Sequence, residues 1–345
     1  YNFGYAAYEA LYAAKRDRSI MPAAKRRQLI DTAHHAFNCC QQLRPDSIAF
    51  FYRDAMICKD FEDKPRLAIP LFENAIVNYE KLGREEQQNV HQQRPKYIRA
   101  MYHLASCHLK TGRPAMSKIL LEKVLAKDQN RDHMSPVFKH FALAKTLHAL
   151  GAPKEALAHL DTAAVRAARS ESVDYVHELA ARCALLVGQV ERAGQYIERI
   201  PLKRRRPYIR WTEADVLVAK GRFSAAVRIL EASAERDRRS RHKSLLRIVR
   251  IYVTESRYEK GFETAARADS FCRDTYGNGS GEAKFWQAAC LYRMEKYDEA
   301  GAIVNDLSRS NFSYPNFRRL TALIHERRQI EKKPARPVPV VTLVK

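Results

Sequence analysis

A short inter-helix turn recurs seven times along the chain, and this recurrence constrains the fold more than any other sequence feature. Apolar residues recur at helical spacing in blocks of roughly 12–15 residues, and a turn separates each block from the next. The turns are centred on Asp63, Gly112, Gly151, Gly188, Gly221, Ser256 and Glu295, at spacings of 33 to 49 residues. The pattern predicts a series of helix pairs joined by short turns.

Small residues flank these turns at two fixed positions. Seven residues before each turn stand Met56, Ala105, Ala144, Ala181, Ala214, Val249 and Ala288. Five residues after each turn stand Ala68, Ser117, Ala156, Ala193, Ala226, Gly261 and Ala300. Small side chains at both positions let two antiparallel helices approach closely, so we expect each pair to pack through these residues.

The units resemble the tetratricopeptide repeat, whose unit is a helix pair of ~34 residues. The resemblance is clearest at 221–226 and 295–300, where the turn is followed by an aromatic and then a small residue. It covers roughly Pro45 to Leu307 and implies an all-α fold, a right-handed α-solenoid of antiparallel helix pairs. The pentatricopeptide repeat, which reads RNA one base at a time, matches the small-residue pattern less well.

Four segments follow from this register. We expect a degenerate N-terminal helix pair at 1–44, a solenoid of about seven units at 45–312, a capping helix at 313–332 and an extended, proline-containing tail at 333–345. The capping helix has a polar face and would cover the last repeat, whose core is otherwise exposed.

The sequence excludes several functional classes. No window approaches ~18 uninterrupted apolar residues, so a membrane-spanning helix is not expected. The seven cysteines form no CxxC pair, which favours a reducing compartment: the cytoplasm, the nucleus or an organelle interior.

Motifs for catalysis or cofactor binding are also absent. The glycine-rich loop at 277–281 lacks the Lys-Ser/Thr pair and the preceding strand of a phosphate-binding loop. His35 and Cys39 share one helical face, but no motif supplies the two further ligands that a zinc site needs. We therefore expect no enzyme, no cofactor and no metal.

Positive charge is concentrated in one part of the chain. The formal net charge is +22, and residues 199–250 alone hold 16 Lys and Arg against 5 Asp and Glu. Such a density of like charge repels itself unless an anionic partner compensates it. Lys243, Arg247 and Arg250 follow helical spacing on a first helix, and the resemblance implies that first helices line the inner surface of the solenoid.

These features give two hypotheses of different class. In the first, the chain is a non-catalytic scaffold that assembles a larger complex by binding an acidic protein or peptide in an electropositive groove. In the second, it is a nucleic-acid-binding subunit of a ribonucleoprotein or another nucleic-acid complex. The predicted partner-binding residues are Lys203, Arg204, Arg205, Arg206, Arg210, Arg239, Lys243, Arg247, Arg250, Arg182, Lys145 and Trp211.

One activity implied by the resemblance is testable in the sequence itself. Some tetratricopeptide domains bind the carboxylate end of chaperone tails through a clamp that contains an asparagine on a first helix. The matching positions here hold Ile57, Ser106, Lys145, Arg182, Asp215, Arg250 and Ala289. Since none is asparagine, a receptor for chaperone tails is not expected.

Overall fold

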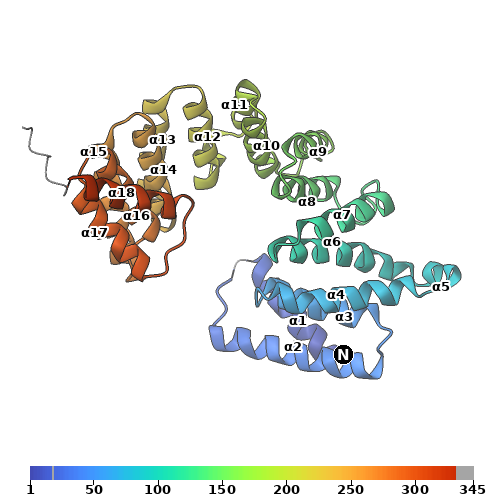
Figure 1. Ribbon diagram of the computed structural model, residues 1–345. Helices are drawn as coiled ribbons and strands as arrows, with labels where there is room; N and C mark the ends of the chain where they lie inside the picture. The colour runs from blue at the N-terminus through green and yellow to red at the C-terminus, as the bar shows by residue number, and fades with distance from the viewer. Residues whose placement is uncertain (18, 332–345) are drawn as a thin grey trace, which may run out of the picture. The chain divides into compact units, whose positions relative to one another are not determined.

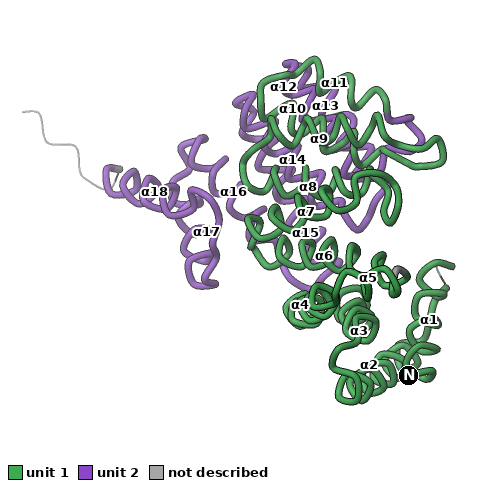
Figure 2. The backbone as a smooth tube through the Cα atoms, turned by 90° about the vertical axis from the view of Figure 1, so that its right-hand side faces the viewer, with its two compact units in different colours: residues 1–199 green, residues 200–345 purple. Residues whose placement is uncertain are grey.

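The computed structural model describes residues 1–17 and 19–331, and within these residues it contains α-helices and short 3₁₀ helices but no strand (Figure 1). The chain divides into two compact units, residues 1–199 and 200–345, coloured separately in Figure 2. The all-α fold predicted from the helical spacing is confirmed. The extended tail expected at 333–345 lies outside the described residues.

Unit 1 consists of five packed helix pairs and a short polar insertion. Its pairs are α1 (Asn2–Arg16) with α2 (Ala23–Leu43), α3 (Ile48–Asp60) with α4 (Pro65–Glu80), α6 (Arg94–Lys110) with α7 (Pro114–Lys127), α8 (Pro136–Ala149) with α9 (Pro153–Val165), and α10 (Asp174–Leu186) with α11 (Val190–Glu198). The insertion holds α5 (Arg84–Asn89) and a 3₁₀ turn, η1 (His91–Gln93). Proline stands at the first position of α4, α7, α8 and α9, where its missing N–H costs no helical hydrogen bond.

Unit 2 has three helix pairs and a terminal helix. The pairs are α12 (Pro207–Ala219) with α13 (Phe223–Arg236), α14 (Arg241–Thr254) with α15 (Tyr258–Tyr276), and α16 (Gly281–Arg293) with α17 (Tyr297–Arg309). Two 3₁₀ turns, η2 (Leu202–Arg204) and η3 (Arg238–Ser240), precede α12 and α14.

The seven predicted turn residues all adopt the left-handed backbone conformation. The four glycines have φ between 71° and 77°, and Asp63, Ser256 and Glu295 have φ of 53°, 58° and 62°. At Gly221 the N–H of Arg222 donates to the carbonyl of Leu217, and the N–H of Gly221 donates to that of Val218. This pattern is the Schellman motif, which ends a helix by satisfying its last carbonyl groups.

The small residues beside the turns are buried where the paired helices meet. Ala105, Ala144 and Ala226 have no exposed surface. A Cβ added at Gly261 on α15 would lie 2.9 Å from Cys290 Sγ on α16, so only glycine fits that contact with the next pair. The predicted helix pairs are therefore confirmed, with the small residues buried between helices.

Helix α18 (Phe317–Glu331) packs on α17 and α16 at the end of unit 2. Phe317 and Ile324 join the apolar core, and Arg328 pairs with Asp298 through an Nε–Oδ1 distance of 2.7 Å. The side chain of Arg328 also covers Gly301. The predicted capping role of this helix agrees with these contacts, while the predicted segment limits stay predictions.

Among the described helices, none combines the length and the apolar character that crossing a bilayer requires.

Candidate anion-binding site

The four basic residues at 203–206 separate into two groups. Lys203, Arg204 and Arg206 are exposed, on η2 and at the start of α12. Arg205 instead turns inward: its Nε donates to the carbonyl of Ile200 at 2.9 Å, and its side chain is 9% exposed. The guanidinium of Arg205 also pairs with Glu213 on α12 at 2.6 Å.

Arg210 pairs with the second oxygen of the same carboxylate. Its distance to Glu213 Oε2 is 2.9 Å, whereas Arg205 contacts Oε1. Two guanidinium groups therefore share one carboxylate.

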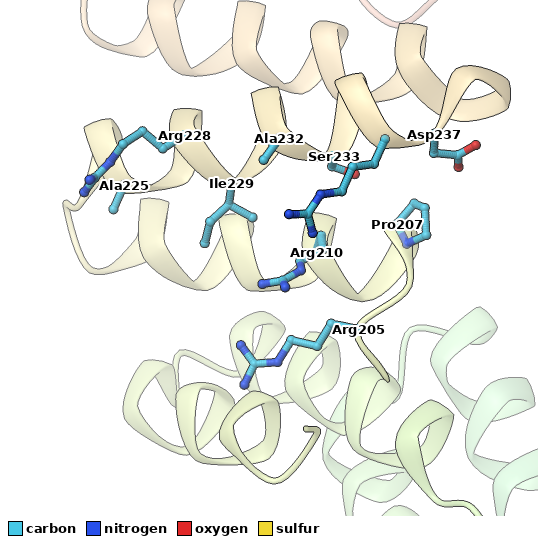
Figure 3. Close-up of a pocket in the computed structure, with 10 residues that line it drawn as sticks. Arg205, Pro207, Arg210, Ala225, Arg228, Ile229, Ala232, Ser233 and Asp237 are labelled. Atoms are coloured by element: carbon cyan, nitrogen blue, oxygen red, sulfur yellow. The ribbon is translucent and has the colours of Figure 1, made fainter. Parts of the chain in front are cut away.

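A pocket of about 450 Å³ lies along α12 and α13 beside this group (Figure 3). Arg205 reaches it from the segment before α12, Arg210 from α12, and Arg228 from α13 (Figure 3). Its apolar wall is formed by Pro207, Ala225, Ile229 and Ala232, and Arg236, Ser233 and Asp237 complete the lining.

Arg228 and Arg236 carry the accessible positive charge of the pocket. Both side chains are exposed, and no carboxylate of the described residues lies within ion-pair distance of either. Asp237 accepts a hydrogen bond from the N–H of Arg239 at 3.1 Å and another from the Ser240 hydroxyl. The lining therefore holds four arginines and one carboxylate, that of Asp237.

Ser233 adds a polar group at the base of the pocket. The residue is 8% exposed, and its hydroxyl oxygen has no hydrogen-bond partner among the described residues. A buried hydroxyl without a partner costs free energy unless a ligand supplies one. The pocket therefore combines cations, an apolar wall and a hydroxyl, a combination that suits an acidic side chain.

The predicted basic stripe on α14 is mostly engaged with neighbouring helices. The guanidinium of Arg247 lies 5.0 Å from the centre of the Trp211 ring, and Trp211 Nε1 donates to Ser244 Oγ at 2.8 Å. Arg250 pairs with Glu282 on α16 at 2.7 Å. Lys243 is exposed, and no acidic group of the described residues pairs with it.

Arg250 has further contacts that fix its position. One of its nitrogens lies 3.2 Å from the hydroxyl of Tyr314, and its guanidinium lies 5.9 Å from the centre of the Trp286 ring. Glu282 and Tyr314 raise the pKa of Arg250, opposing the effect of its burial, which lowers it. Arg250 therefore connects α14 to α16 and to the segment before α18.

The other predicted residues lie apart from the pocket. Arg239 is exposed on η3, and its carbonyl accepts from the Tyr276 hydroxyl at 3.1 Å. Lys145 on α8 and Arg182 on α10 are exposed and belong to unit 1. They form no part of the pocket lining in unit 2.

Four residues of the pocket were not predicted from the sequence: Arg228, Arg236, Ile229 and Ser233. All four lie on α13, a second helix, where spacings of four and three residues put Ile229, Ser233 and Arg236 on one face and Arg228 lies at its edge. That spacing is the sequence signal for this site, but the prediction was confined to first helices.

The structure is therefore that of an all-α protein built of packed helix pairs, and its unit 2 contains an arginine-lined pocket. The sequence profile of the tetratricopeptide repeat matches residues 98–130, which correspond to α6 and α7. This confirms the resemblance inferred from the turns and small residues: the chain contains a tetratricopeptide repeat and has the fold of that family. No curated protein matches the chain.

Solved structures of tetratricopeptide-type proteins share the fold. A tetratricopeptide repeat protein from Parabacteroides merdae ATCC 43184 is 11% identical, with 80% of this chain and 99% of that chain covered and a TM-score of 0.56. Yeast Tom70 is 12% identical, with 90% and 61% covered and a TM-score of 0.57. The APC/C hetero-tetramer Cut9–Hcn1 is 11% identical, with 91% and 58% covered and a TM-score of 0.51. At these identities the likeness establishes the fold alone.

Proposed function

We propose that this chain is a non-catalytic interaction scaffold whose unit 2 binds an acidic peptide segment in the arginine pocket. The fold is one that supports protein-interaction scaffolds in general. The observation that carries the finer proposal is the pairing of two uncompensated arginines, Arg228 and Arg236, with an apolar wall on α13.

The pocket would bind both the carboxylate and the methylene groups of a Glu or Asp side chain. Arg228 and Arg236 stand about 12 Å apart along α13, so each can meet its own carboxylate of the segment, and a guanidinium can donate two parallel hydrogen bonds to a carboxylate. The methylene groups pack on Ile229 and Ala232, and the hydroxyl of Ser233 can donate to an oxygen that enters the pocket. Arg205 and Arg210 are held in place by Glu213 and strengthen the local field.

The exposed cations outside the pocket have a different role in this proposal. Lys203, Arg204, Arg206, Arg239 and Lys243 are exposed in unit 2. Such charges speed the encounter with an acidic partner and make the association rate depend on salt. These charges attract an acidic partner from a distance, whereas the pocket binds its side chains at a defined position.

A nucleic acid is the less favoured ligand on the same observations. A phosphate backbone is recognised along an extended surface by many point contacts. The pocket of about 450 Å³ instead lies along one helix pair and has an apolar wall, which suits the side chains of a short acidic segment better.

Fluorescence anisotropy with a labelled peptide of alternating Glu and Leu tests the proposal. The whole chain should bind this peptide and not a Lys-Leu peptide of equal length. The double variant Arg228→Glu/Arg236→Glu should weaken binding at least ~10-fold, which corresponds to ~1.4 kcal/mol.

The matched control is Lys123→Glu/Lys154→Glu, which changes the net charge equally at exposed positions of unit 1. It should leave the affinity within about twofold once salt is fixed. Equal losses in both variants would mean that only bulk charge matters and would refute the pocket. Tighter binding of oligouridine or duplex DNA than of the peptide would replace the proposal with nucleic-acid binding.

A further inference from the structure

Three potential metal ligands meet between α2 and α3 in unit 1. His34 comes from α2, while Asp54 and Cys58 lie one turn apart on α3 and so share a face. One ligand atom of each lies within 4.8 Å of the other two. Asp54 and Cys58 are 3% and 4% exposed, so bulk water is largely excluded from the cluster.

Two further side chains hold these groups in position. Gln41 Nε2 donates to Asp54 Oδ2 at 2.9 Å, and the other carboxylate oxygen, Oδ1, is hydrogen-bonded to His34 Nδ1. His34 Nε2 lies 3.0 Å from Glu62 Oε2, and Lys64 pairs with the second oxygen of Glu62 at 2.6 Å. In metal sites, a carboxylate on the far nitrogen of a histidine fixes the tautomer whose near nitrogen coordinates, so an ion here would replace the hydrogen bond between His34 Nδ1 and Asp54 Oδ1.

The surroundings of Cys58 differ from those of its equivalents. Cys58, Cys107, Cys183 and Cys290 occupy the same position in their repeats, five residues before the turn, and all four are buried. Close packing of helices accounts for a small residue at this position. It does not account for a histidine and a carboxylate beside the thiol, and within residues 1–17 and 19–331 only Cys58 has a full set of such neighbours.

We propose that His34 Nδ1, Asp54 Oδ1 and Cys58 Sγ bind one divalent zinc-type metal ion. Nitrogen, oxygen and sulfur donors together favour Zn²⁺ over the hard cations Mg²⁺ and Ca²⁺, which take oxygen ligands. Water would fill the fourth position of a tetrahedral site. The ion would join α2 of the first helix pair to α3 of the second.

A second pair of potential ligands in this region, His35 and Cys39, was not predicted to bind a metal. His35 Nε2 and Cys39 Sγ are 3.9 Å apart, but the pair is exposed, and His35 and Cys39 lie outside the cluster of His34, Asp54 and Cys58. An exposed His–Cys pair can still bind Zn²⁺ weakly, so the experiment must remove it.

The competing explanation is that His34 is an imidazolium bridging Asp54 and Glu62 without any ion. Calorimetric titration of Zn²⁺ into the chelator-treated whole chain, in a Cys39→Ser background, separates the two. We expect one equivalent to bind, and Co²⁺ in place of Zn²⁺ to give a thiolate charge-transfer absorption band. No binding in this background, or Co²⁺ binding without that band, overturns the proposal.

Single substitutions locate the site. Cys58→Ser should weaken Zn²⁺ binding at least ~10-fold, whereas the matched variant Cys107→Ser, at the same position of the next repeat, should bind as the background does. Should Cys58→Ser fail to show the native circular dichroism spectrum, His34→Gln replaces it, with the same expected loss. Unchanged affinity in a folded Cys58 or His34 variant assigns the ion to another site and refutes the proposal.

Discussion

The guanidinium of Arg247 on α14 lies 5.0 Å from the centre of the Trp211 ring on α12. The two helices are the first helices of neighbouring pairs, and the Trp211 ring is itself fixed by a hydrogen bond to Ser244. A cation over an aromatic face contributes about 0.5–2 kcal/mol, most where water is excluded. Arg247 therefore stabilises the stacking of pairs in unit 2, in addition to any contact with a partner.

This contact predicts a difference in stability between two basic residues of one helix. Arg247→Glu should lower the free energy of unfolding by about 1–2 kcal/mol, because it removes the cation from the Trp211 ring. Lys243→Glu, at an exposed position four residues earlier, should change it by no more than about 0.5 kcal/mol. Urea denaturation followed by circular dichroism measures both, and equal effects would show that the Trp211 contact does not contribute.

Because residue 261 is glycine, we predict that substitutions at Gly261 and Cys290 have coupled effects on the stability of unit 2. In the wild type, Gly261→Ala should destabilise unit 2 by about 1–3 kcal/mol, since the new Cβ would lie 2.9 Å from Cys290 Sγ. In a Cys290→Ala background the same change should cost much less, because the obstructing sulfur is gone and alanine favours the helix. A double-mutant cycle by urea denaturation gives the coupling, and additive effects would contradict the steric explanation.

The turns and the helix pairs could be predicted from the sequence because each is encoded locally. Gly112, Gly151, Gly188 and Gly221 mark positions where the backbone must be left-handed. Glu295 and its non-glycine equivalents could be predicted as turn residues only because the small residues on either side keep the same spacing there. No sequence pattern of this kind marks the division between residues 199 and 200, and it was not predicted.

The candidate site was only partly predictable because charge along a sequence does not show which cations are neutralised. Arg205 and Arg210 were selected, but both pair with Glu213, whose role depends on how the segment before α12 turns. Arg228 and Arg236 were not selected, although both line the pocket from α13 without a carboxylate partner among the described residues. Which arginine pairs with a carboxylate depends on the folded structure, and the sequence alone does not show it.

The left-handed turns predict opposite effects for two substitutions. At Gly221 a Cβ would meet nothing within 4 Å, so Gly221→Ala tests backbone strain alone and should cost about 1 kcal/mol. Glu295 is exposed with φ of 62°, so Glu295→Gly should remove strain and stabilise by about 0.5 kcal/mol. Thermal unfolding of the two variants under one set of conditions tests the signs, and a stabilised Gly221→Ala would contradict the turn assignment.

Burial lowers the pKa of His103 to about 3, which predicts that acid weakens unit 1 before its carboxylates titrate. The ring stacks on Phe72 with centroids 5.9 Å apart, and its Nδ1 has no hydrogen-bond partner among the described residues. The unfolded chain binds a proton at His103 below pH ~6.5 while the native chain does not, so stability falls as the pH drops below that value. Between pH 7.5 and 5 the loss should be on the order of 2 kcal/mol. His140, whose pKa is lowered to about 4 by burial and by His159, adds to the loss with the same sign.

The variant His103→Phe keeps the stacking and gives up no hydrogen bond, so urea denaturation at the two pH values should show a distinctly smaller loss. An identical pH dependence in wild type and His103→Phe would show that other groups control the acid sensitivity.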